Sequence, residues 1–132
     1  MEFKKRLSIS LFSLRLGVFI VMFMWTLDKF INPGHAAAVF KKFYFIDGLS
    51  LQAAYLVGAV QMLIVIGFLI GFKKKWTYGI VLVMHSVSTF SSFAKYLDPW
   101  KSLLFFAAWP MLAACLALFL LRDEDGLFSV SS

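Results

Sequence analysis

Four long apolar stretches, separated by short polar connections, dominate the hydropathy pattern of the chain. A hydrocarbon layer about 30 Å thick requires about 20 helical residues at 1.5 Å per residue. Each stretch reaches that length and carries few charges. We therefore predict an all-α integral membrane protein, a bundle of four transmembrane helices over about residues 8–31, 49–72, 76–97 and 102–121.

The composition narrows the class of protein further. Of the 132 residues, 61% are hydrophobic and 15% are charged, whereas about a quarter of the residues in a soluble domain are charged. Four spans would occupy about 80 positions. The remainder suffices only for connections, which excludes a separate soluble catalytic domain. We expect one four-helix membrane domain over residues 1–132.

The basic residues predict the orientation of the bundle. The net charge of +6 comes from Lys and Arg at segment ends, a pattern that indicates membrane topology and no nucleic-acid partner. The N-terminus, the second connection and the C-terminus hold Lys4, Lys5, Arg6, Lys73, Lys74, Lys75 and Arg122. The first and third connections hold Lys41, Lys42, Lys95 and Lys101. Because positive charge accumulates on the inside, both termini are predicted to be cytoplasmic.

The first apolar stretch has a competing interpretation as a secretory signal peptide. Lys4–Arg6 would be its basic region and Ala36–Ala38 its cleavage site. However, Arg15 interrupts the apolar run, and Asp28 and Lys29 stand between that run and the alanines. These charges favour a helix that is retained.

Local signals refine the connections and the helix contacts. Residues 32–48 form the longest connection, for which a short interfacial helix and an irregular cap are equally compatible with the sequence. The pairs Ala54–Gly58 and Gly67–Gly71 have the four-residue spacing that lets helices approach closely. Pro110 is expected to kink the fourth helix.

Two charges on the first helix are too close together to reach opposite headgroup regions. Arg15 and Asp28 are 13 residues apart, about 20 Å along a helix. Arg15 can extend toward the cytoplasm on its long side chain, whereas Asp28 is expected to face the bundle interior and find a partner. In the alternative, Asp28 is solvated at the outer rim and Arg15 is the deep charge. Lys29 points about 100° away from Asp28 and is not its automatic partner.

A polar stripe follows the outer half of the third helix. His85 lies near the predicted midplane, as does Gln61 on the second helix. Helical spacing places further polar residues on the face of His85, namely Ser88, Thr89, Ser92 and Tyr96. The stripe suggests an outward-facing intramembrane pocket. In the competing interpretation, the hydroxyls bond their own helix and His85 bonds Gln61.

Several chemistries lack the residues that they require. The single cysteine, Cys115, excludes an internal disulfide. The two histidines, His35 and His85, lie at different predicted depths, which argues against a zinc site or a haem held by two histidines. We therefore expect no metal and no covalently bound cofactor.

The order and spacing of several motifs resemble the DoxX family of small four-helix bacterial membrane proteins. The motifs are Arg15–Gly17, Trp25–Pro33, Gly58–Gln61, Gly67–Gly71, the His85 face, Tyr96–Pro99 and Arg122–Asp125. The resemblance implies a four-helix bundle in the bacterial cytoplasmic (inner) membrane. Some relatives are redox-associated, including the small subunit of a thiosulfate–quinone oxidoreductase, and others assist disulfide or cofactor maturation. This chain lacks the paired cysteines that direct disulfide exchange needs.

Three functions remain compatible with the sequence. The first is a quinone- or lipid-linked redox accessory subunit, with a membrane redox partner or as a homo-oligomer. The second is a membrane chaperone or scaffold for partner membrane proteins, and the third is an oligomeric small-solute transporter or channel. The candidate ligand-binding or proton-relay residues are Trp25, Asp28, Gln61, His85, Ser88, Thr89 and Ser92. The expected structural charges are Arg15, Lys29 and Asp98.

Overall fold

The computed structural model describes residues 2–32, 35, 38, 41–42, 51–98, 100 and 103–130, without the side chains of residues 51, 93 and 94. Its long helices are α1 (Phe3–Ile31), α3 (Leu51–Ile70), α4 (Lys74–Ser91) and α6 (Ala108–Leu120). Its short helical elements are α5 (Phe93–Tyr96) and the 3₁₀ turns η1 (Leu103–Ala107) and η2 (Arg122–Glu124). The all-α prediction is confirmed.

Within the described residues, three helical stretches are long and apolar enough to cross a membrane. They are Phe3–Ile31, Gln52–Ile70 and Leu103–Leu120, and most of their side chains are not buried inside the protein. Apolar helices with exposed apolar side chains are stable in lipid and costly in water, so these helices indicate a multi-pass membrane protein. The 18 residues of α4 extend over about 27 Å, and a fourth crossing by this more polar helix stays a prediction.

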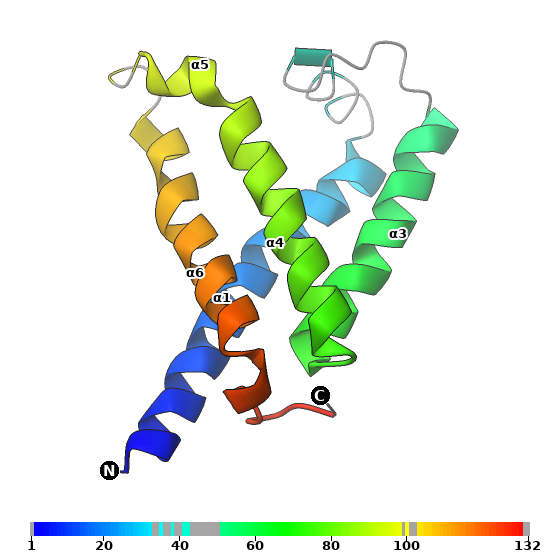
Figure 1. Cartoon of the computed structure of the whole chain (residues 1–132). Coiled ribbons are helices and arrows are strands. Elements are labelled where there is room, and N and C mark those ends of the chain that lie inside the picture. The colour runs from blue at the N-terminus through cyan, green and yellow to red at the C-terminus, as the bar shows by residue number, and fades with distance from the viewer. Residues whose placement is uncertain are drawn as a thin grey trace.

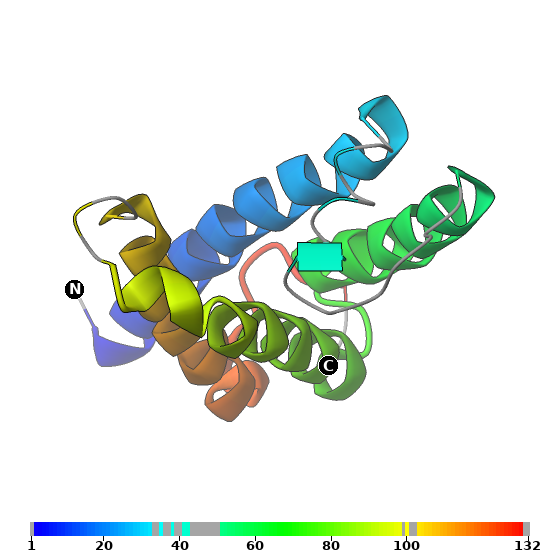
Figure 2. The same ribbon diagram turned by 90° about the horizontal axis from the view of Figure 1, so that it is seen from above.

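The helices pack in two pairs that meet toward one end of the molecule (Figures 1 and 2). α1 lies against α3, and α4 lies against α6, while α3–α4 and α1–α6 contacts join the pairs. Both chain ends and the turn between α3 and α4 lie at the same end in Figure 1, which we call the terminal end. α5 lies at the opposite end, which we call the α5 end.

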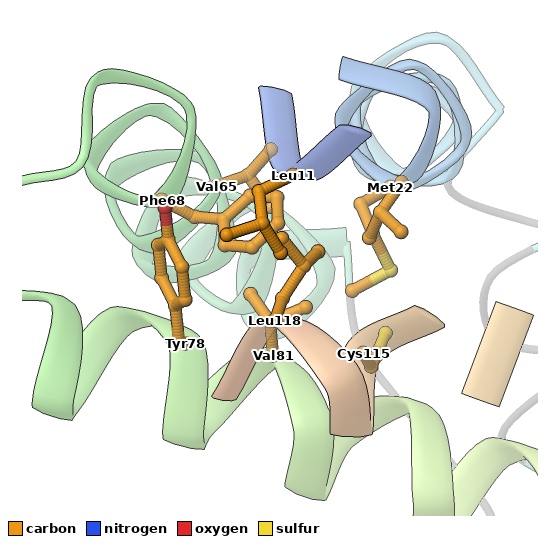
Figure 3. Packing of buried hydrophobic residues seen from close by; sticks show 9 residues of the cluster. Leu11, Met22, Val65, Phe68, Tyr78, Val81, Cys115 and Leu118 are labelled. Atoms are coloured by element: carbon orange, nitrogen blue, oxygen red, sulfur yellow. The ribbon is translucent and has the colours of Figure 1, made fainter. Parts of the chain in front are cut away.

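The apolar core takes residues from all four long helices (Figure 3). Its labelled members are Leu11, Met22, Val65, Phe68, Tyr78, Val81, Cys115 and Leu118. On α1 the buried positions follow a helical period, Leu11, Arg15, Val18, Met22 and Thr26, which places them on one face. A buried arginine therefore belongs to the face that otherwise supplies the core.

Two predicted helices end or begin differently from the sequence prediction. The third predicted helix breaks after Ser91, and its remaining residues form α5. Thr89 and Ser92 hydroxyls bond the carbonyls of His85 and Ser88 just before that break, and such bonds often bend helices. Pro110 lies in the first turn of α6, immediately after η1. Proline is tolerated there because first-turn N–H groups have no helical partner. The change from 3₁₀ to α helix comes just before Pro110.

The small residues of α3 have two different roles. A Cβ atom on Gly58 would lie 3.0 Å from the Phe30 ring and 3.3 Å from Lys29 Cβ, so this glycine marks the close approach of α1 and α3. Gly71 has φ +71° and lies in the turn that follows α3, where a left-handed backbone favours glycine. The predicted close contact is therefore found at Gly58, while Gly71 makes a turn.

The first and third connections meet at the α5 end. Lys42 lies within hydrogen-bonding distance of Lys95 and carries the same charge, and both effects lower the pKa of Lys95. Most of the connection over residues 32–48, including any interfacial helix or cap, lies outside the described residues. Lys42 and Lys95 therefore lie close together at the α5 end, and the side of the membrane that this end faces stays a prediction.

Candidate functional site

A buried charged cluster occupies the terminal end of the bundle. The side chains of Arg15 on α1 and Asp125 after η2 are both fully buried, and Arg15 Nη1 lies 3.2 Å from Asp125 Oδ1. The Tyr78 hydroxyl of α4 donates to Asp125 Oδ2 at 2.5 Å and accepts from Arg15 Nη1 at 3.3 Å. Lys74 Nζ donates to the backbone carbonyl of Asp125. The cluster thus joins α1, α4 and the C-terminal residues.

The chain after α6 crosses the terminal end of the bundle, and we call residues 122–130 the C-terminal strap (Figure 1). Arg15 Nη2 donates to the carbonyl of Leu127, and the rings of Phe12 and Phe128 lie 5.0 Å apart. The backbone N–H of Val130 donates to the carbonyl of Ile70 at 2.8 Å. The strap therefore satisfies polar groups of α1, α3 and α4 at once, and its first role is structural.

The burial of Arg15 answers the question of which charge on α1 is deep. The Arg15 side chain does not extend to the surface, because it pairs with Asp125, whose side chain is also fully buried. The expectation that Asp28 faces the interior is wrong: its side chain is 29% exposed. Asp28 accepts from Asn32 Nδ2 at 3.4 Å, and His35 Nδ1 lies 2.5 Å from its other oxygen. The structure therefore fits the alternative, in which Arg15 is the deep charge and Asp28 lies nearer the surface.

The sequence reasoning missed Asp125 and Tyr78. Asp125 belongs to the acidic run Asp123–Asp125, which is typical of a solvated helix end, and its neighbours Asp123 and Glu124 are indeed exposed. The signal available beforehand was Arg15 itself, because a charge on a core-facing helix position requires an anionic partner.

His85 is a further buried polar residue, and it is not part of the charged cluster. The side chain of this α4 residue is 1% exposed. Its Nε2 atom lies 3.0 Å from the backbone carbonyl oxygen of Ala108, the first residue of α6. The ring stacks on Trp25 of α1, with centroids 5.9 Å apart and an interplanar angle of 27°. His85 is therefore held between α1 and α6.

One nitrogen of His85 remains unused. A carbonyl oxygen only accepts hydrogen bonds, so Nε2 carries a hydrogen and donates it to Ala108. A neutral imidazole has one N–H, which leaves a lone pair on Nδ1. This atom is buried and has no hydrogen-bond partner among the described residues. Such an unpaired acceptor is costly in an apolar interior and marks a place where a hydrogen-bond donor would be stabilised.

Aromatic side chains that are partly exposed surround this part of the bundle. Trp25 is 46% exposed and Trp109 is 40% exposed, so both rings reach the apolar outer surface of the helices. Trp109 packs edge-on against Phe90, with centroids 5.7 Å apart, and its ring is tilted by 46° against that of Tyr96, with centroids 5.2 Å apart. The Tyr96 hydroxyl is also buried without a partner in the described part of the chain. His85 Nδ1 and the Tyr96 hydroxyl are thus two buried polar atoms without a hydrogen-bond partner among the described residues.

The remaining stripe residues do not converge on His85. The hydroxyls of Thr89 and Ser92 bond carbonyls of α4, as the competing interpretation predicts. Gln61 Nε2 lies 3.9 Å from the sulfur of Met84, and the structure shows no His85–Gln61 hydrogen bond between these two described residues. Ser88 is half-buried and supplies its backbone carbonyl to Ser92.

Two further predicted charges lie at the α5 end. Lys29 is half-buried, and its Cβ atom approaches Gly58. Asp98 is exposed, and its backbone N–H donates to the carbonyl of Lys95 at 3.3 Å. The structural role expected for both residues stays a prediction.

Comparison with known proteins finds no match. No protein-family model, no curated protein and no solved structure matches this chain. The likeness to the DoxX family therefore rests on the sequence motifs alone.

Proposed function

We propose that the protein is a quinone- or lipid-linked redox accessory subunit of the bacterial cytoplasmic membrane. In this proposal, the head group of an amphiphilic ligand binds next to His85 while its tail stays in the lipid. The observation that carries the proposal is the unpartnered Nδ1 atom of a histidine that is 1% exposed. A buried acceptor without a donor is rare in folded proteins, and a bound ligand would remove its cost.

The surroundings of His85 support a lipophilic ligand over a water-soluble one. Trp25 stacks on the imidazole and is itself 46% exposed, so the His85 region borders the outer surface of the bundle through an aromatic ring. Aromatic rings bind planar head groups by stacking. A ligand dissolved in the bilayer approaches His85 past Trp25 without crossing the C-terminal strap.

The proposal gives His85 the role of hydrogen-bonding the ligand and Trp25 the role of orienting it. It assigns Asp28 no role in proton transfer, because that carboxylate lies at the rim with Asn32 and His35. In this proposal, the chain holds the ligand for a redox partner in the membrane. The partner, and not a residue of this chain, transfers the electrons.

A binding experiment tests this function. Decylubiquinone and its reduced form would be titrated into the protein in lipid nanodiscs, with empty nanodiscs as the correction for partition. The His85→Ala variant should bind about tenfold more weakly, which corresponds to one buried hydrogen bond. Ser86→Ala is the matched control, because Ser86 is adjacent to His85 and its hydroxyl bonds Leu82 within α4. Equal binding by wild type and His85→Ala would contradict the proposal.

A further inference from the structure

We infer that the His85 site selects ligands that carry an O–H group, such as a quinol or another phenol, over ligands whose head group offers only acceptor oxygens. The inference rests on the proposed function and makes it more specific, because it names the chemical class of the head group. It depends on the hydrogen bond between His85 and Ala108, which decides what the second nitrogen is able to do.

The Ala108 carbonyl assigns the hydrogen atom of the imidazole. Nε2 lies 3.0 Å from that oxygen, a normal distance for N–H···O. Since the oxygen has no hydrogen to give, Nε2 is the donor. The other ring nitrogen, Nδ1, then has a lone pair and can only accept a hydrogen bond.

The buried position of His85 disfavours protonation of Nδ1. If Nδ1 were also protonated, the ring would carry a positive charge, and a buried charge is costly unless it is paired. The contacts that hold the ring are the Trp25 ring and a neutral carbonyl. The charged cluster of Arg15, Lys74 and Asp125 lies at the terminal end, and Asp28 is engaged at the rim. The neutral form with a free acceptor therefore prevails.

A ligand oxygen facing Nδ1 must bring its own hydrogen. A quinol or phenol donates O–H to Nδ1 and satisfies it, whereas a quinone carbonyl would place one lone pair against another. An unsatisfied buried acceptor costs enough free energy to change binding by about tenfold or more. The site is thus expected to discriminate between two oxidation states of the same ring, although both have nearly the same shape.

The Tyr96 hydroxyl does not produce this selectivity. A hydroxyl both donates and accepts, so Tyr96 can serve either a carbonyl or an O–H group equally well. The Tyr96→Phe variant therefore tests whether the selectivity comes from a polar group near Trp109 or from His85 Nδ1, which only accepts. Whatever its affinity for each ligand, this variant should keep the wild-type ratio between donor and acceptor ligands.

The experiment compares ligands that differ in one hydrogen-bond donor. 4-Dodecylphenol and 4-dodecylanisole differ by replacement of O–H with O–CH₃, and neither needs a redox reaction. Decylubiquinol and decylubiquinone provide a second pair. The quinol, which carries the O–H groups, does not have the smaller head group, so size does not explain a preference for it. Affinities are measured in nanodiscs containing the full chain, with empty nanodiscs as reference. We expect the phenol and the quinol to bind at least about tenfold more tightly than their partners.

Variants then assign the selectivity to His85. In His85→Ala the ratio within each pair should fall to about one, whereas Ser86→Ala and Tyr96→Phe should keep it. If both members of each pair bind wild type equally and His85→Ala weakens both, the inference fails while the proposed function stands. If none of the four ligands binds above empty nanodiscs, the proposed function fails with it. The wild-type ratio decides the inference even where a variant does not fold.

Discussion

Arg15 shows how one residue can be placed correctly in a helix and still have an unforeseen environment. Its position on a core-facing α1 register follows from the helical period of Leu11, Val18 and Met22. What the period does not reveal is the partner, since Asp125 is 110 residues away in the sequence. Tyr78 and the Leu127 carbonyl satisfy part of the hydrogen-bonding capacity of this buried ion pair, whereas Arg15 Nε has no hydrogen-bond partner among the described residues.

Removing the charge of Asp125 should strongly destabilise the bundle. The Asp125→Asn variant leaves Arg15 buried without a counter-charge, and breaking a buried pair on one side costs about 3–5 kcal/mol. The free energy of unfolding in detergent micelles measures the effect. Asp123→Asn is the control, because Asp123 is exposed, and surface substitutions usually change stability by about 0.5 kcal/mol or less. Equal losses in both variants would contradict the importance of the cluster.

At the scale of the elements, apolar length predicts the helices and local chemistry decides their ends. α1, α3 and the combination of η1 and α6 coincide with predicted spans. The break after Ser91 and the 3₁₀ start before Pro110 depend on hydroxyl bonds and on a missing N–H, which a hydropathy pattern does not contain. The carbonyl of Ala108 contacts His85 beside that 3₁₀–α junction.

The close approach of α1 and α3 should depend on the absence of a side chain at position 58. The Gly58→Leu variant would drive carbon atoms into the Phe30 ring, which lies 3.0 Å from the position of a Cβ atom. Overpacking of this kind costs about 1–3 kcal/mol. Gly17→Leu is the matched control, because a Cβ atom at that α1 glycine meets nothing within 4 Å and leucine is the better helix former. Unfolding midpoints in micelles report both, and an unchanged midpoint for Gly58→Leu would refute the close contact.

At the scale of the whole molecule, polar contacts at the two ends join segments that are distant in the sequence. The C-terminal strap joins α1, α3 and α4 at the terminal end, and Lys42 meets Lys95 at the α5 end. The four long helices in the described part of the chain could be predicted from hydropathy. The strap could not, because its contacts depend on three-dimensional proximity. The same holds for the free nitrogen of His85, whose chemistry depends on Ala108, 23 residues away.

The lysine pair at the α5 end predicts a pH effect. Lys42 lowers the pKa of Lys95 in the folded protein, so the folded state disfavours the charged form of Lys95. The resulting destabilisation is present at low pH and is relieved as the pH rises through that pKa. Lys42→Met should raise the pKa of Lys95 toward its ordinary value, as followed by NMR of methylated lysines. Lys73→Met, at the other end of the bundle, should leave it unchanged, and the same result for both variants would refute the interaction.

The arrangement of the ends also predicts the topology in the membrane. The basic residues of the terminal end predict that this end faces the cytoplasm, and the α5 end should then face outward. In a Cys115→Ala background, which has no other cysteine, Asp98→Cys should react with an impermeant maleimide in intact cells. Lys73→Cys should react only after the cells are permeabilised. The reverse pattern would contradict the proposed orientation.

The central claim, that His85 offers a free acceptor nitrogen inside the bundle, has a direct spectroscopic test. Because the chain has only two histidines, the His35→Gln variant leaves a single imidazole for ¹⁵N NMR in nanodiscs. We predict a protonated Nε2 and an unprotonated Nδ1, with the Nδ1 resonance shifting on addition of 4-dodecylphenol and not of 4-dodecylanisole. A protonated Nδ1 beside a bare Nε2, or equal shifts with both compounds, would contradict the account.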